Sequence, residues 1–167
     1  MIKVGFIGAG DISLLHSEGV HSSENAVLSG IWNRTRKKAE EKSRLFNCRV
    51  FDKVEDLIEA VDVVYVLTNM ETHHQYARQA IDAGKHVLVE KPTAVTIDEI
   101  KDLKKAADAQ GVQVAPVHNY IYEPSVTRAK ELIESGKIGD LVSLYVLYNI
   151  HHPESVAARY PGVIRQI

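Results

Sequence analysis

Two glycines near the start of the chain, Gly8 and Gly10, constrain its fold more than any other feature. They follow a short apolar run at residues 2–7 and precede a stretch at residues 12–20 with helical character. Between a buried strand and a helix, the first glycine permits a tight turn and the second lets the backbone approach a pyrophosphate group. The helix N-terminus then offers N–H groups and a partial positive charge. The opening residues therefore predict a βαβ unit with a phosphate-binding turn.

The turn continues through Asp11 and Ile12, which are expected to contact the bound group together with the two glycines. Ser13 stands where the dinucleotide-binding pattern has a third glycine or an alanine, so the helix and the strand are expected to pack slightly less closely. A glycine pair alone is weak evidence, because any tight turn can use one. Its place inside a complete βαβ unit favours dinucleotide binding.

Strands and helices alternate along the first 118 residues, with short connections. The run at residues 61–67 is almost continuously apolar, which is typical of a parallel strand covered on both faces. Capping-box spacings mark three expected helix starts, at Asp52–Glu55, Thr72–Gln75 and Thr96–Glu99. The expected strands span residues 2–7, 26–32, 49–51, 61–67, 86–89 and 112–117. This order predicts an α/β fold with a doubly wound parallel sheet, the nucleotide-binding arrangement called a Rossmann domain.

The rhythm changes after residue 120. A helix is expected at residues 124–135, followed by a long strand at residues 141–150 for which no partner strand follows. A lone strand cannot bury its edges. The sequence therefore predicts a Rossmann domain at residues 1–120, and at residues 121–167 the beginning of an α+β second domain that looks truncated.

The end of the second strand reads Asn33-Arg34, where dinucleotide-binding domains that prefer NAD have an acidic residue for the ribose 2′-hydroxyl. Without the acid a 2′-phosphate is not repelled, and the Arg34 guanidinium can pair with it in a two-pronged fashion. The sequence thus leans slightly towards NADP over NAD. The alternative is a solvated basic helix start, with Asn33 bonding the ribose of either cofactor.

A charged turn, Glu90-Lys91-Pro92, follows the fifth expected strand at the edge that lines the ligand crevice of open α/β sheets. It occurs together with the glycine turn, with Thr68 followed by His73, and with a late stretch at residues 136–139 that reads Gly-Lys-Ile-Gly. In this order and spacing, the sequence resembles the Gfo/Idh/MocA (glucose–fructose oxidoreductase, inositol dehydrogenase, rhizopine catabolism) family of NAD(P)-dependent oxidoreductases. The resemblance covers essentially all 167 residues.

The resemblance implies a catalytic role for Lys91, next to the nicotinamide ring and the substrate hydroxyl. A lysine near the positive charge of the oxidised ring has its ammonium form disfavoured, so it can take or return the hydroxyl proton during hydride transfer. Glu90 would lie beside the cofactor, and Pro92 would shape the turn. The implied reaction moves a hydride between the cofactor and a hydroxyl-bearing carbon of a sugar, cyclitol or related metabolite.

The resemblance also implies cofactor contacts at the ends of other strands. Thr68 and Asn69 would face the cofactor backbone, and Asn119, within residues 118–120, would face the same crevice. His73 matches a frequent family histidine and is expected to be structural or adjacent to the cofactor. Family members are about twice as long, and their second domain supplies an Asp-x-x-x-His motif and the sheet through which subunits associate. No such motif follows Lys91, so the chain is either a fragment or a truncated relative.

Composition and charge bear on the other classes of protein to which the chain could belong. A net charge of −2, with both signs interspersed, gives no sign of a nucleic-acid or membrane partner. Cys48 is the only cysteine, which excludes a disulfide framework and fits a cytoplasmic setting. The adjacent His151 and His152 lack a third ligand at metal-binding spacing, so no metal is expected. The alternatives to a dehydrogenase are a non-catalytic NAD(P)-binding module and, third, a methyltransferase, which would not explain Lys91.

Overall fold

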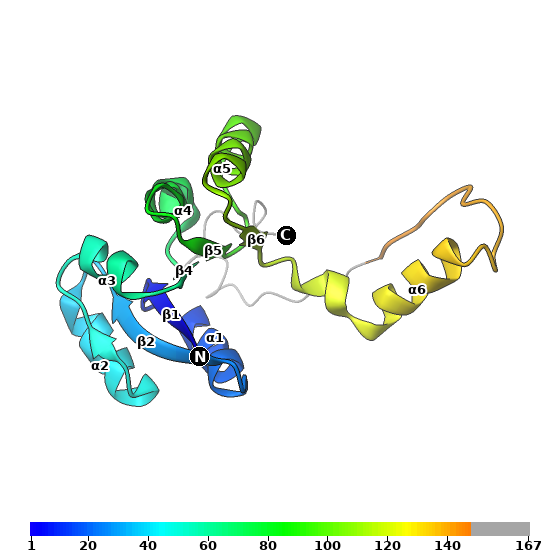
Figure 1. Cartoon of the computed structure of the whole chain (residues 1–167). Coiled ribbons are helices and arrows are strands. Elements are labelled where there is room, and N and C mark those ends of the chain that lie inside the picture. The colour runs from blue at the N-terminus through cyan, green and yellow to red at the C-terminus, as the bar shows by residue number, and fades with distance from the viewer. Residues whose placement is uncertain (148–167) are drawn as a thin grey trace. The chain divides into compact units, whose positions relative to one another are not determined.

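Six parallel strands form one sheet in the order β3-β2-β1-β4-β5-β6 (Figure 1). The structure is a computed structural model, and it describes residues 1–147. The chain divides into two compact units, residues 1–117 and 118–167. The sheet and the first five α-helices belong to the first unit.

The first unit alternates strands and helices in the order that the sequence predicts. The strands are β1 (Ile2–Ile7), β2 (Ala26–Trp32), β3 (Arg49–Val50), β4 (Val63–Val66), β5 (His86–Val89) and β6 (Val114–Pro116). The α-helices are α1 (Ile12–His21), α2 (Arg36–Phe46), α3 (Val54–Ala60), α4 (His73–Asp82) and α5 (Ile97–Gln110), and the 3-10 helix η1 (Met70–Thr72) precedes α4. The doubly wound parallel sheet is confirmed.

Each face of the sheet carries its own apolar core. One core joins the sheet to α1 and α2 and is centred on Phe6 and Ile31, which are fully buried. The other joins it to α3, α4 and α5, through residues such as Leu57, Ile81 and Leu103. This two-sided burial explains why the strands are apolar on both faces. Because every strand pair is parallel, the carboxyl ends of the strands lie at one common edge.

An irregularity in β2 sets which side chains reach the first core. The pairing of β1 with β2 shifts between Val4 and Gly5, so that Val4 lies opposite Leu28 and Gly5 lies opposite Gly30. Leu28 and Ile31 are three residues apart yet both join the core with α1 and α2. A β-bulge changes the alternation of side chains in this way. Simple period-two alternation would not have placed both residues on one face.

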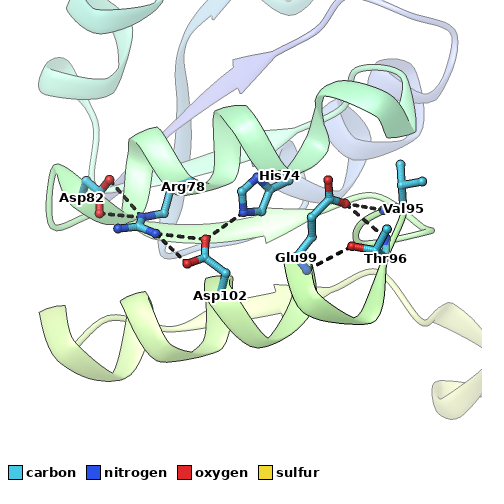
Figure 2. Close-up of polar contacts among 7 residues, drawn as sticks. All are labelled: His74, Arg78, Asp82, Val95, Thr96, Glu99 and Asp102. Carbon is cyan, nitrogen blue, oxygen red and sulfur yellow. Dashed lines mark hydrogen bonds and ion pairs between the residues drawn. The ribbon is translucent and has the colours of Figure 1, made fainter.

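Two of the three expected capping boxes are wrong. Helix α3 begins after Lys53 with no side-chain cap, and the Asp52 carboxylate pairs with Arg36 instead. Helix α4 also lacks a side-chain cap, because the Thr72 hydroxyl lies against the Thr68 hydroxyl at 2.8 Å. The box at the start of α5 is confirmed, with Thr96 accepting from the Glu99 N–H at 3.2 Å (Figure 2). Competing side-chain partners, Arg36 for Asp52 and Thr68 for Thr72, decided the outcome at the first two sites.

The second unit, as far as it is described, contains the 3-10 helix η2 (Asn119–Tyr122) and the helix α6 (Pro124–Glu134). Pro124 opens α6, and Gly136 and Gly139 follow it with positive φ angles of 68° and 70°. The long strand expected at residues 141–150 is not formed at residues 141–147, which are exposed and have no strand assignment, and residues 148–150 lie outside the described part. Within residues 1–147, no helix combines the length and apolar content needed to cross a membrane.

Candidate functional site

A pocket of about 200 Å³ opens at the carboxyl-terminal edge of the sheet in the first unit. It lies among the ends of β1, β2 and β4 and the first turns of α2 and α4. Six residues predicted to bind a cofactor line it: Gly8, Gly10, Asn33, Arg34, Thr68 and Asn69. The sheet therefore gathers three segments that are far apart in the chain around one cavity.

The two glycines of the first turn do different things. Gly8 has a φ of 118°, and a Cβ on it would lie 2.6 Å from the Leu67 carbonyl oxygen, so no other residue fits there. A Cβ on Gly10 would meet nothing within 4 Å, so the space beside its backbone is open. Ser13 is fully buried and its hydroxyl donates to the Gly10 carbonyl at 2.6 Å. The serine thus closes the turn from within the helix.

Asn33 holds the glycine turn against the end of β2. Its side-chain oxygen accepts from the Ala9 N–H at 3.1 Å, and its amide nitrogen donates to the Thr35 carbonyl at 3.0 Å. The next residue, Arg34, is exposed and lines the pocket. Lys38, in the first turn of α2, lines it too and was not predicted. Local spacing gave no signal for it, because Arg34 precedes α2, which begins at Arg36, and the two residues do not share a helix face.

The opposite wall of the pocket comes from β4 and α4. The Thr72 hydroxyl lies 2.8 Å from the Thr68 hydroxyl and 2.9 Å from the Asn69 carbonyl oxygen, which ties the end of β4 to the start of α4. Tyr76 and Trp32 pack ring against ring, with centroids 5.5 Å apart, and both line the pocket. The aromatic pair was not predicted, because its partners are 44 positions apart in the chain and no local pattern joins them.

Glu90 follows β5 and is buried, at 8% exposure. One carboxylate oxygen, Oε1, accepts from His16 Nε2 at 2.9 Å, and the other, Oε2, accepts from the Lys91 N–H at 2.9 Å. Burial raises the pKa of the Glu90 carboxyl, but the His16 and Lys91 hydrogen bonds outweigh it, so the pKa lies below its usual range. Glu90 is therefore a buried carboxylate. His16 was missed in the sequence because nothing near it in the chain points to its partner.

The side chain of Lys91 is exposed, at the carboxyl-terminal edge where β5 lies next to β4. The Lys91–Pro92 peptide bond is cis. Lys91 and Glu90 lie outside the lining of the pocket, as do Asp11 and Ile12 of the first turn. The catalytic role expected of Lys91 and the cofactor contacts expected of the other three stay predictions.

His73, the first residue of α4, is 1% exposed. Its Nδ1 lies 2.8 Å from the Pro92 carbonyl oxygen, and its Nε2 lies 2.9 Å from the Thr68 carbonyl oxygen. Each ring nitrogen therefore lies within hydrogen-bond distance of one backbone carbonyl oxygen. The imidazole therefore links the turn after β4 to the turn after β5. Both ring nitrogens are engaged in this link, and His73 is not part of the pocket lining.

Asn119 begins η2 in the second unit, and its expected contact with the cofactor stays a prediction. His151 and His152 lie outside the described residues. Among residues 1–147, no group of three or more histidine, cysteine or acidic side chains is arranged to hold a metal ion. Burial raises the pKa of the Cys48 thiol to about 11, so this cysteine is not a thiolate nucleophile at neutral pH.

A second polar cluster joins α4 to α5. Figure 2 shows Arg78 between Asp82 and Asp102, with His74 also bonded to Asp102. Hydrogen bonds from His74 and then Arg78 hold the pKa of Asp102 below its usual range, and the two aspartates raise the pKa of Arg78. Every charge in the cluster is paired within it. Its bonds from His74 and Arg78 of α4 to Asp102 of α5 hold the two helices together. None of its members lines the pocket.

Comparison with known proteins identifies relatives of the whole first unit. The family model described as "Oxidoreductase family, NAD-binding Rossmann fold" matches residues 2–118. The chain is 33% identical to glucose-6-phosphate 3-dehydrogenase of Bacillus subtilis over 87% of its length and 42% of that protein. It is also 33% identical to the scyllo-inositol 2-dehydrogenase (NADP(+)) IolW of Bacillus subtilis, over 95% of this chain and 44% of the relative.

A solved structure gives the same result. The WlbA dehydrogenase of Bordetella pertussis, determined in complex with NADH and UDP-GlcNAcA, superposes with a TM-score of 0.78 at 26% identity. The match covers 83% of this chain and 41% of that structure. The chain spans less than half the length of each of these three proteins.

Proposed function

The chain belongs to the Gfo/Idh/MocA family of oxidoreductases, and from that membership we propose that it acts as an NAD(P)-dependent dehydrogenase on a hydroxyl-bearing carbon. The single observation that carries the proposal is the pocket at the ends of β1, β2 and β4. Its glycine turn leaves open space at Gly10 beside a helix N-terminus, which suits a pyrophosphate. Arg34 and Lys38 add positive charge at one end of the same pocket.

The residues of the pocket fit a nicotinamide dinucleotide in their chemistry. Gly10 and the start of α1 would hold the pyrophosphate, and Thr68 and Asn69 would face the middle of the cofactor. Asn33 is already committed to the Ala9 N–H and the Thr35 carbonyl, so it would contribute mainly by keeping the turn in shape. When bound, the nicotinamide ring supplies a hydride acceptor or donor.

Lys91 would handle the proton of the reaction. When the alcohol carbon loses a hydride, its hydroxyl must also lose a proton, and the Lys91 Nζ takes it as the C–O bond becomes a carbonyl. In the reverse direction the Lys91 ammonium returns the proton to the carbonyl oxygen. Glu90 keeps the backbone at this turn in place through its bond from the Lys91 N–H. No other group from the described residues is needed for proton balance.

The proposal includes a preference for NADP over NAD. No acidic residue follows β2, and two cationic side chains, Arg34 and Lys38, line that end of the pocket. A 2′-phosphate would pair with the guanidinium in a charge-assisted, two-pronged hydrogen bond. The relatives include both cofactors: the scyllo-inositol dehydrogenase is named for NADP(+), and the WlbA structure contains NADH.

Titration of the chain with NADPH and NADH, followed by nicotinamide fluorescence, tests the cofactor. NADPH should bind about tenfold more tightly than NADH, and Arg34→Ala should remove that difference. Arg44→Ala is the matched control, because Arg44 lies near the end of α2, the helix that follows Arg34, and outside the pocket lining. Equal binding of both cofactors in the wild type would contradict the preference, and binding of neither would contradict the dehydrogenase proposal for this chain.

The substrate class we propose is a small polyhydroxylated ring, a sugar or cyclitol. It rests on the relatives, which are named for glucose 6-phosphate and scyllo-inositol. Turnover of either compound with NADP⁺, abolished by Lys91→Ala with cofactor binding intact, would support it. Cofactor binding without turnover on such rings would favour a non-catalytic NAD(P)-binding module. A cytoplasmic location and association into homo-oligomers belong to the same proposal; the lone cysteine supports the first, and the family resemblance supports the second.

A further inference from the structure

His16 and Glu90 form a side-chain pair whose partners are 74 residues apart in the chain. His16 lies on α1 and Glu90 follows β5, and the two side chains are 15% and 10% exposed. The imidazole Nε2 is 2.9 Å from the Glu90 Oε1. Because an ionised carboxylate can only accept hydrogen bonds, the imidazole is the donor. The pair therefore joins the helix of the glycine turn to the turn that carries Lys91.

The His16 ring is held in one orientation by aromatic neighbours. It stands edge-on to Tyr65 of β4, with ring centroids 5.6 Å apart and an interplanar angle of 81°. It is also edge-on to Phe6 of β1, at 6.4 Å and 79°. Phe6 and Tyr65 stack on each other at 5.4 Å. Edge-to-face contacts of this kind are favourable geometries for aromatic rings. Side chains of two strands thus hold the imidazole in the orientation in which it meets Glu90.

Glu90 passes this orientation on to the next residue. Its second oxygen, Oε2, accepts from the backbone N–H of Lys91 at 2.9 Å. Both carboxylate oxygens are therefore bonded, one to a helix on one side and one to the peptide group of Lys91 itself. A free carboxylate could rotate about its χ angles, whereas a carboxylate bonded at both oxygens holds that peptide group in place.

We propose that His16 is a positioning residue for the reaction and that it acts through Glu90 on the turn that carries Lys91. The inference rests on the proposed function, because it is the proton-transferring lysine that is positioned. Stability alone does not account for the pair. A buried carboxylate and its hydrogen-bond donor are often no more stabilising than apolar side chains of similar size, since taking a charged group out of water is costly. The bond from Glu90 to the Lys91 N–H is what gives the pair a functional target.

The test uses the full chain, labelled for NMR, with three variants. His16→Leu removes the donor, and His16→Gln restores a side-chain N–H that can reach Glu90. His21→Leu is the matched control, because His21 lies on the same helix and its ring bonds only the Ser17 carbonyl within that helix. Two quantities are measured: the hydrogen-exchange rate of the Lys91 amide, and the pKa of the Glu90 carboxyl from its carbon chemical shift.

In His16→Leu the Lys91 amide should exchange about tenfold faster than in the wild type, because the carboxylate that holds it is released. The pKa of Glu90 should rise, because the side chain stays buried while its strongest donor is lost. His16→Gln should restore most of both quantities, and His21→Leu should leave both unchanged. If His16→Leu fails to fold, His16→Asn, whose amide is too short to reach Glu90, must show the same acceleration.

An unchanged Lys91 exchange rate in His16→Leu, or an equal change in His21→Leu, would overturn the proposal and leave His16 a structural residue. Titration of the same variants with NADPH and NADH separates this outcome from failure of the proposed function. His16→Leu should bind either dinucleotide within about twofold of the wild type, since His16 is not part of the pocket lining. Absence of binding in the wild type itself would contradict the proposed function while the exchange measurements still decide the role of His16.

Discussion

Two regions at the carboxyl-terminal edge of the sheet, the glycine turn with the end of β2 and the turn at residues 90–92, differ in which groups they present. The glycine-turn side, which comprises Gly8, Gly10, Asn33 and Arg34, presents backbone and open space, and its charged side chain is exposed. The lysine side is the turn at residues 90–92. Two histidines, His16 and His73, bond this turn, and their side chains are largely buried. A ligand held mainly by backbone groups needs shape, whereas a reacting side chain needs other side chains to hold it. Under the proposed function, the difference indicates that cofactor binding and proton transfer would place separate demands on one sheet edge.

Gly8→Ala should have the largest effect of any single change in the crevice. The new Cβ would lie 2.6 Å from the Leu67 carbonyl oxygen at a φ of 118°, so the end of β4 must move. We expect a loss of about 2–5 kcal/mol in the free energy of unfolding, measured by urea denaturation.

Gly10→Ala is the matched control on the same turn, because its Cβ meets only open space. Its free energy of unfolding should stay within about 0.5 kcal/mol of the wild type, while NADPH binding weakens. Equal destabilisation by the two alanines would contradict the distinction between a glycine required by the fold and one required by the ligand.

His73→Leu should have the next largest effect, now on the lysine side. Leucine fills a similar space but has no ring nitrogen to bond the Pro92 and Thr68 carbonyl oxygens. Both oxygens would then lose the partner that the buried His73 ring provides. The free energy of unfolding should fall by about 2–3 kcal/mol in urea denaturation. His74→Leu, on the adjacent and more exposed residue, should cost clearly less. The reverse order would show that His73 does not link the two turns.

Acidification should weaken the lysine side selectively. The pKa of Glu90 is lower in the folded chain than its ordinary value, so its contribution to stability is present above that ordinary value and is lost as the pH falls through the folded one. Between about pH 5 and pH 3, the free energy of unfolding of the wild type should therefore fall more than that of Glu90→Gln. Parallel curves for the two proteins would show that the His16 bond does not stabilise the carboxylate.

Asp102→Asn should have the smallest effect on stability, because Asp102 lies in neither the glycine-turn side nor the lysine side. Its carboxylate is shared by His74 and Arg78 on the partly exposed α4–α5 surface, where water and salt screen ion pairs (Figure 2). The melting temperature should change less than it does in Glu90→Gln, and the difference from the wild type should shrink further in about 1 M NaCl. A larger change than in Glu90→Gln would mean that the polar cluster between α4 and α5, and not the crevice, dominates the electrostatic stability of this unit.

The fold could be predicted from local patterns in the chain. The apolar run at residues 2–7, the glycines after it and the nearly continuous apolar strand near residues 63–66 each carry their structure within a few neighbouring residues. Strand boundaries at 2–7, 26–32 and 86–89 agree with the prediction for the same reason. The shortening of the edge strand β6 and the bulge in β2 were not predictable, because both depend on how neighbouring strands pair.

The candidate site divides in the same way. Gly8, Gly10, Asn33 and Arg34 were accessible to sequence reasoning, because a turn between a strand and a helix is a local motif and its neighbour at the end of β2 has a known offset. The capping boxes at Asp52 and Thr72 failed because the Asp52 carboxylate pairs with Arg36 and the Thr72 hydroxyl bonds the Thr68 hydroxyl. Spacing alone does not show which of several available partners a polar side chain bonds.

The amino-acid sequence was sufficient for the order of elements, the parallel sheet and the glycine turn, since hydrophobic period and turn chemistry act over a few residues. Only the tertiary structure could bring His16 to Glu90, place His73 between two turns, and put Lys38 in the same pocket lining as Arg34. These contacts depend on which strands lie next to each other and in what register. That is decided by how the whole sheet and its helices bury their apolar faces together, and no segment of the chain carries it alone.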